Sequence, residues 1–189
     1  MNIACSLSCS LALALASTTA LADAPAVYGF EGLTVPFYSA GFIPDGYADA
    51  TWTGWILRRR DELQYTGLNG GSGAILALGM VSAPEIHFDA PVVFDGLLAF
   101  YPHAQLSYDL YLGTQHMATS VPGPVGGGYL ASGYAGAVDR IVFNGPAGGF
   151  SIDDMAVIAA APVPEPAGWA LMLAGTAALG LFRLRRQQR

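Results

Sequence analysis

Glycine and proline recur throughout the middle of this chain, and they leave little room there for a long helix. The 189 residues include 24 glycines and 12 prolines. Glycine destabilises a helix interior through its conformational entropy, and proline lacks the N–H that a helix needs. Between them lie short runs rich in Val, Ile, Phe and Tyr, with little 3.6-residue periodicity. The pattern predicts an all-β domain.

The predicted strands are short, and several alternate apolar with polar residues. In the clearest of them, 105–112, Leu106, Tyr108 and Leu110 recur at every second position, which is the period of a half-buried strand. The other predicted strands are 27–35, 74–81, 85–89, 92–101, 139–144 and 149–158. Roughly seven to nine strands within residues 23–162 suit a single β-sandwich that is jelly-roll-like.

The last predicted strand changes phase at its acidic pair. Phe150 and Ile152 share one face, whereas Met155 and Val157 would fall on the opposite face of an unbroken strand. A β-bulge at Asp153–Asp154 would restore the register and re-aim a carboxylate.

Residues 1–22 have the order of a secretory signal peptide. An apolar run ends at Leu21, and Ala20 and Ala22 supply the small residues that signal peptidase requires, so cleavage is predicted after Ala22. The alternative is a buried first helix. Both cysteines, Cys5 and Cys9, lie in the removed segment, which predicts a mature protein without a thiol, a disulfide or a cysteine metal site.

The other end of the chain predicts a membrane helix. Residues 167–182 contain no charge, and as a helix they would span about 24 Å, somewhat less than a bilayer core of about 30 Å. The four arginines that follow can extend to the interface and orient the helix, with the tail in the cytoplasm and the domain outside. They are Arg183, Arg185, Arg186 and Arg189. The alternative is an apolar core helix with a solvated basic end.

A short proline motif, Val163-Pro164-Glu165-Pro166, stands between the domain and this helix, after an Ala/Pro linker. Each proline fixes φ and pushes the residue before it toward an extended conformation, which is the form that a peptidase grips. Residues 163–189, taken in order, resemble the PEP-CTERM sorting signal of Gram-negative bacteria. The alternative is a plain proline-rich spacer before an anchor.

The resemblance implies a sorting route. In that family an exosortase, a membrane-embedded cysteine transpeptidase, reads the signal, and the proteins are associated with exopolysaccharide and biofilm. Pro164, Glu165 and Pro166 would then be recognition residues and not catalysts. The protein would be anchored in the inner membrane with its domain in the periplasm, and after processing it would reach the cell surface or the outside.

Charge excludes some partners of the domain. Residues 23–162 contain four arginines, no lysine and thirteen acidic residues, a net charge of −9. Such a surface repels nucleic acid and anionic lipid.

A second, shorter resemblance concerns calcium. The run Phe150-Ser151-Ile152-Asp153-Asp154 is similar to the closing strand of galactose-binding-like sandwiches. In members of that fold that bind calcium, an acid on the first strand and one on the last share the ion, which makes Glu31 with Asp153 or Asp154 the candidate ligands of a structural calcium ion. Calcium takes six to eight oxygens. The alternative is that these acids are solvated at a strand end.

Aromatic residues beside the basic run 58–60 suggest a carbohydrate contact. Tyr47, Trp52 and Trp55 would stack on sugar rings if exposed, and arginine binds acidic groups, so an anionic exopolysaccharide is the candidate ligand. The alternative is a core tryptophan pair followed by a solvated loop.

Motifs for catalysis are weak. The three histidines, His87, His103 and His116, do not have zinc-site spacing, and Ser72 lacks the second glycine of a nucleophile elbow because Ala74 stands there. No catalytic residue is predicted. The leading hypothesis is a non-enzymatic surface or matrix protein, and the alternatives are a secreted carbohydrate-active enzyme or a lectin-like module with the same sorting tail.

Overall fold

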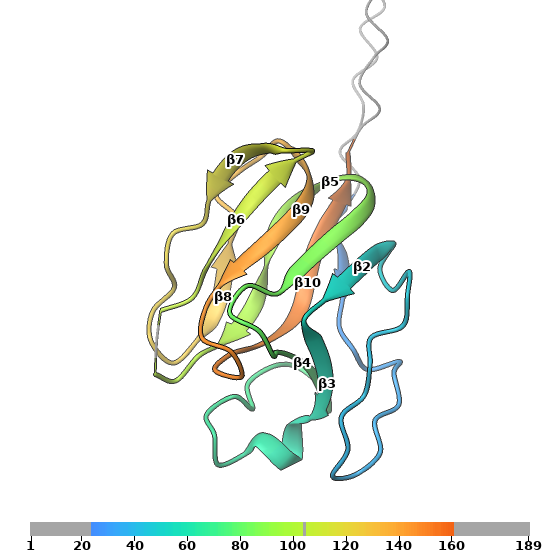
Figure 1. The fold of residues 1–189 in the computed structure, drawn as a ribbon, viewed down its shortest axis with the longest axis vertical. Coiled ribbons are helices and arrows are strands. Elements are labelled where there is room, and N and C mark those ends of the chain that lie inside the picture. The colour runs from blue at the N-terminus through green and yellow to red at the C-terminus, as the bar shows by residue number, and fades with distance from the viewer. Residues whose placement is uncertain (1–23, 104, 161–189) are drawn as a thin grey trace, which may run out of the picture.

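The computed structural model describes residues 24–103 and 105–160, and in this part the chain is all-β (Figure 1). Ten antiparallel strands form one continuous sheet, with a single short 3-10 helix among the described residues. The elements are β1 (Ala26–Tyr28), β2 (Ala50–Thr53), β3 (Trp55–Arg59), η1 (Arg60–Leu63), β4 (Ile75–Gly79), β5 (Glu85–Phe100), β6 (Ser107–Leu112), β7 (Gln115–Thr119), β8 (Gly128–Ala131), β9 (Ala137–Asn144) and β10 (Ser151–Ala159). The predicted signal peptide, 1–22, and the predicted sorting segment, 163–189, lie outside the described residues.

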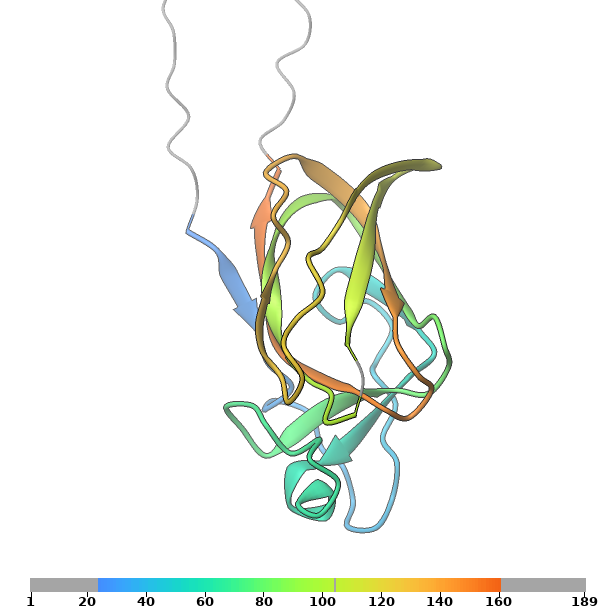
Figure 2. The same cartoon turned by 90° about the vertical axis from the view of Figure 1, so that its left-hand side faces the viewer.

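The sheet curls because its longest strand changes partners along its length. The strand order is β3-β4-β10-β5-β9-β6-β7, and β1 is added to β10 while β2 and β8 are added to β5. The first part of β5 pairs with β2 and β9, and its last part pairs with β10 and β8. The sheet therefore closes around one interior (Figure 2).

Aromatic side chains fill much of that interior. The Trp55 ring lies 4.9 Å from Phe143 and 5.6 Å from Phe150, centroid to centroid, and both contacts are edge-to-face. Phe94 and Tyr108 extend the cluster. Rings of this size dominate the energetics of a core, and edge-to-face pairs add to their area burial. In the described residues this packing, and not a disulfide, holds the sheet together.

The all-β prediction is confirmed, but several strand boundaries were wrong. The predicted strands 85–89 and 92–101 are one strand, β5, because the chain stays extended through Pro91 while the pairing with β9 shifts register there. Proline cannot donate to a ladder, so a bulge is where a strand tolerates it. The predicted strand 27–35 shortens to β1, because the chain turns at Phe30, whose carbonyl accepts from the Leu33 N–H.

The predicted bulge in the last strand is confirmed. In β10, Asp153 pairs with Leu98 while Ala156 pairs with Gly96, so the register shifts between them. Asp154 takes the left-handed φ of +44° that this requires. The bulge puts the apolar residues on both sides of the acidic pair into the core, namely Phe150, Ile152, Met155 and Val157.

The arrangement gives the domain two distinct ends. Ala26 pairs with Val157, so the start of β1 and the end of β10 lie side by side. At the opposite end lie η1 and the loops around residues 30–45 and 64–74 (Figures 1 and 2). Within the described ranges, no helix has the length and apolarity to cross a bilayer.

Candidate functional site

One loop, residues 69–74 between η1 and β4, gathers the three acids of the candidate calcium site. The Ser72 N–H donates to Asp153 Oδ2 at 3.0 Å, and the Ser72 hydroxyl donates to Asp154 Oδ1 at 2.9 Å. The Ala74 N–H donates to Glu31 Oε2 at 2.9 Å. The β10 bulge positions the two aspartates, and the turn after β1 positions the glutamate.

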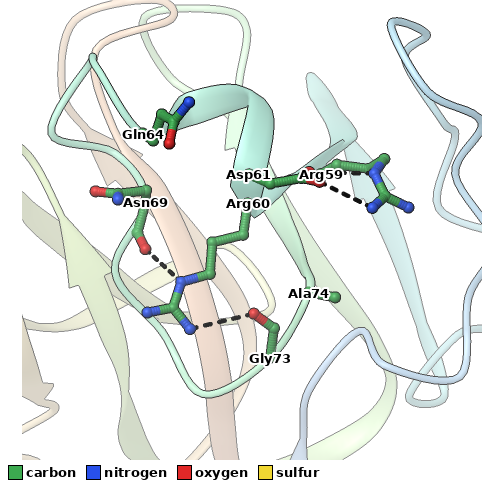
Figure 3. A pocket seen from close by; sticks show the side chains of 7 residues that line it. All are labelled: Arg59, Arg60, Asp61, Gln64, Asn69, Gly73 and Ala74. Atoms are coloured by element: carbon green, nitrogen blue, oxygen red, sulfur yellow. Dashed lines mark hydrogen bonds and ion pairs between the residues drawn. The ribbon is translucent and has the colours of Figure 1, made fainter.

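An arginine holds the same loop through its carbonyl groups. Arg60 Nε donates to the Asn69 carbonyl at 2.6 Å, and Nη1 donates to the Gly73 carbonyl at 3.3 Å (Figure 3). The loop therefore gives N–H groups to carboxylates and carbonyl groups to a guanidinium. Hydrogen bonds with one ionised partner are stronger than neutral ones. The positive Arg60 and the negative carboxylates therefore fix the loop conformation together.

Glycine is required where the carboxylates approach the loop backbone. A Cβ at Gly71, which has φ +120°, would lie 2.5 Å from Asp153 Oδ2. A Cβ at Gly73 would overlap the Glu31 carboxylate. In the sequence this glycine-rich run resembled an incomplete nucleophile elbow, whereas in the structure it permits close contact with acids.

Burial sets the electrostatics of this cluster. Asp153 is 1% exposed, and burial raises the pKa of its carboxyl group, while N–H donors from Asp154 and Ser72 act in the opposite direction. The nearby charges of Asp154 and Glu31 add to the increase. Burial also raises the pKa of Tyr47, whose hydroxyl donates to the Gly29 carbonyl close to these acids.

The acids do not converge on one point as a calcium site would require. Among the residues that the structure describes, no group of three or more His, Cys, Asp or Glu is arranged to hold a metal ion. One oxygen of each acid already accepts a hydrogen bond from the loop, in Glu31, Asp153 and Asp154. Calcium binding therefore stays a prediction, and it would require these side chains to move.

A hollow of about 310 Å³ lies beside the same loop, on the side of Arg60 and η1 (Figure 3). Its lining is polar and comes from two short segments of chain. The lining residues are Arg59, Arg60, Asp61, Gln64, Asn69, Gly73 and Ala74. Arg59 is bonded to Asp61, its Nη2 lying 3.0 Å from Asp61 Oδ2, whereas Arg60 has no carboxylate partner among the described residues.

Known proteins offer no assignment for this geometry. Comparison of the chain with protein-family models, with curated proteins and with solved structures finds no match.

The predicted carbohydrate-contact residues lie in or against the core. Trp55 is 5% exposed, and its Nε1–H donates to the Glu85 carbonyl at 3.0 Å, so it has no free ring face. The Trp52 Nε1–H donates to the Tyr47 carbonyl at 2.9 Å, and both of these rings pack against the core while remaining partly exposed. Sugar stacking stays a prediction, for which only Tyr47 and Trp52 offer ring surface.

A different set of aromatic residues, which the sequence patterns did not predict as a contact surface, is exposed. Tyr38 is 86% exposed and Phe37 is 56% exposed, and their ring centroids are 5.3 Å apart. The Arg59 guanidinium lies 4.2 Å from the centroid of the Phe37 ring. Phe42 and Tyr65 are also exposed. The available signal was the Phe-Tyr pair directly after Pro36, in a segment without strand periodicity.

Proposed function

We propose that this chain is an exported, non-enzymatic surface or extracellular-matrix protein that an exosortase sorts through its C-terminal motif. The observation that carries the proposal is the order of three features, namely the motif Pro164-Glu165-Pro166, the uncharged run 167–182 and the arginine cluster that ends at Arg189. The signal peptide at 1–22, read by signal peptidase, agrees with the export that this order requires.

The fold of the domain supports a tethered arrangement. Because β1 and β10 are paired, both ends of the described chain leave the domain on one side. A domain anchored in the inner membrane through the segment after Ala160 would present its opposite end, with η1 and the loop 69–74, away from the membrane (Figure 1). After processing, that end would face the surroundings of the cell and any exopolysaccharide there.

The curled sheet supports the finer fold that we infer, a jelly-roll-like β-sandwich. Antiparallel strands on both sides of the interior contribute to one core. In such domains the loops at one end of the sandwich are free to vary without affecting the core. This favours, as a second candidate function, a lectin-like module, because the exposed rings of Phe37 and Tyr38 lie on such loops.

Replacement of the motif tests the sorting proposal. The triple variant Pro164→Ala, Glu165→Ala, Pro166→Ala should still be exported and inserted, since the signal peptide and the arginine-flanked run are intact. In an exosortase-positive host, fractionation with an antibody against residues 23–162 should find the full-length protein in the inner membrane. The control, Pro162→Ala, should be processed normally. If the triple variant reached the surface in shortened form, and did so at the wild-type rate, the motif would be only a spacer.

A further inference from the structure

We propose that the η1 end of the domain binds a polysaccharide bearing carboxylate groups, through Arg60 and the exposed rings of Phe37 and Tyr38. This rests on the proposed function and deepens it by naming the class of ligand and the residues that bind it. Arg60 begins η1, whereas Phe37 and Tyr38 lie in the segment between β1 and β2. Both segments lie at the end of the domain opposite the start of β1 and the end of β10 (Figure 1).

Arg60 differs from the other arginines in the described residues because no carboxylate neutralises it. Arg58 pairs with Glu62 at 3.5 Å, Arg59 pairs with Asp61 at 3.0 Å, and Arg140 pairs with Glu85 at 3.5 Å. Arg60 instead donates to two backbone carbonyls, which orient the guanidinium but leave it its full charge.

The geometry leaves part of the Arg60 guanidinium free for a ligand. Its second terminal nitrogen makes no hydrogen bond among the residues drawn in Figure 3. The hollow of about 310 Å³ beside it is also lined by Gln64 and Asn69, residue types whose amides bond to hydroxyl groups. A planar guanidinium held in advance loses little freedom when it binds a carboxylate.

The aromatic pair is linked to this hollow through one arginine. Arg59 connects them, because it lines the hollow and its guanidinium lies 4.2 Å from the centroid of the Phe37 ring. Tyr38 continues the surface, and its N–H donates to Glu62 Oε1 at 2.5 Å. Tyr38, Phe37 and Arg59 therefore form a strip, which continues along the backbone to Arg60, whose side chain extends to the other side, toward the loop 69–74 (Figure 3). Aromatic faces beside hydrogen-bonding groups fit a chain of sugar rings.

The backbone at Tyr38 supports a binding role for its ring. Tyr38 has φ +56°, a left-handed conformation that is uncommon for a bulky residue and costs free energy. The strained conformation leaves the ring 86% exposed and does not bury it. Large exposed apolar groups of this kind mark interaction surfaces.

Local charge favours an acidic polymer over a neutral one, although the domain is acidic as a whole. On β3 and η1, the run Arg58–Arg59–Arg60 is followed by Asp61 and Glu62, and each of these acids is bonded to one of the first two arginines. Arg60 is the arginine of this run without an ion pair, although three acids contact the loop that it holds. A carboxylate on the ligand would supply that pair. The other acids of the domain repel a polyanion at longer range, and salt screens this repulsion.

The test compares a polyuronate with its uncharged ester. The protein isolated from membranes in mild detergent is titrated with polygalacturonate and with fully methyl-esterified polygalacturonate, which has the same sugar backbone without the charge. We expect affinity for the ester to be about tenfold lower, the size of one charge-assisted hydrogen-bonded contact. Equal affinity for both, or no binding to polygalacturonate, would overturn the proposal. Equal affinity for inorganic polyphosphate, an anionic polymer without sugar rings, would also overturn it, by showing an unspecific anion surface.

Variants assign the binding to the strip. Arg60→Gln and Tyr38→Ala should each lower affinity for polygalacturonate by about tenfold. Arg140→Gln and Val121→Ala, which remove an arginine and an exposed apolar side chain elsewhere, should not. Arg60→Gln also removes bonds to the loop, so Tyr38→Ala, whose exposed side chain makes no hydrogen bond in the described residues, is the decisive variant. Unchanged affinity of Tyr38→Ala would contradict the proposal. Sorting takes no part in this assay, so its failure and a failure of the motif variant are distinguishable.

Discussion

The Asp153 carboxylate accepts a hydrogen bond from the Ser72 N–H at 3.0 Å, across 81 positions of the chain. The contact ties the bulge of the last strand to the loop that precedes β4. It is made possible by the bulge, which buries Asp153 while its neighbours Ile152 and Met155 stay in the core. The bulge therefore has two effects. It restores the register of β10, and it places the Asp153 carboxylate where it anchors the loop.

Removal of this anchor should destabilise the domain. Asp153→Ala leaves the N–H groups of Ser72 and Asp154 without their acceptor. A hydrogen bond contributes about 0.5–1.5 kcal/mol to stability, and more where one partner is charged, so we expect a loss of about 1–3 kcal/mol in the free energy of unfolding, measured with urea. Asp45→Ala, an exposed acid on another loop, is the matched control and should change little. A variant as stable as the wild type would show that the anchor has no energetic role.

Because the loop is closely packed, a Gly→Ala substitution in it should destabilise the domain, whereas the same substitution at an open position should not. In Gly71→Ala the new Cβ would lie 2.5 Å from Oδ2 of the buried Asp153 and 2.8 Å from Cδ2 of Leu76, at a φ of +120° that strains an L side chain, so the loop must move. Overpacking of this kind costs about 1–3 kcal/mol. At Gly32 a Cβ would meet nothing within 4 Å, so Gly32→Ala should leave the thermal midpoint nearly unchanged. Equal midpoints for the two variants would contradict the contact between the loop and Asp153.

Calcium can be tested at the same loop. If Glu31 and Asp154 rearrange to bind the ion, calcium should raise the midpoint of thermal unfolding, because a ligand that binds the folded state alone stabilises it. Magnesium at equal concentration is the control for ionic strength, and Asp154→Asn should abolish the increase. An unchanged midpoint would contradict the calcium prediction and leave these acids as acceptors for the loop alone.

The acid stability of the domain should depend on Asp109. Burial acts to raise the pKa of this carboxyl, but hydrogen bonds from Thr119, Asn144 and His116 outweigh it and hold the pKa below its ordinary value. A lowered pKa in the folded state stabilises the fold above the unfolded value of about 3.9, and this contribution is lost as the pH falls through the folded value. Asp109→Asn should therefore flatten the decrease in unfolding free energy between about pH 5 and about pH 2. A profile parallel to that of Asp45→Asn would refute this role.

Features of the fold that depend on neighbouring residues alone could be predicted from the sequence. Alternation located the strand that became β6, and the phase change between Ile152 and Met155 was sufficient to place the bulge, because both depend on neighbouring residues alone. Four strands were missed, namely β2, β3, β7 and β8. Each is short, and β7 and β8 are mostly polar or exposed, so pairing with β5, β4 or β6 rather than a local pattern holds them in place.

The candidate site was less accessible to sequence reasoning because it depends on distant contacts. Nothing near Ser72 in the sequence indicates that its N–H meets Asp153, and nothing near Arg60 shows that it lacks a carboxylate partner. The exposed pair Phe37 and Tyr38 was overlooked in favour of Trp55, because tryptophans beside arginines suggested a surface whereas the Trp55 ring is buried.

Sorting through the C-terminal motif is tested most directly by the intact mass of the protein released from the surface of an exosortase-positive host. We expect a mass that corresponds to a chain beginning at Asp23 and lacking the apolar run 167–182 with the arginines after it, whether or not a new group has been joined to the shortened end. In a host without the exosortase, the same segment should remain on the protein. A released protein whose mass still includes residues 167–189 would contradict sorting through this motif.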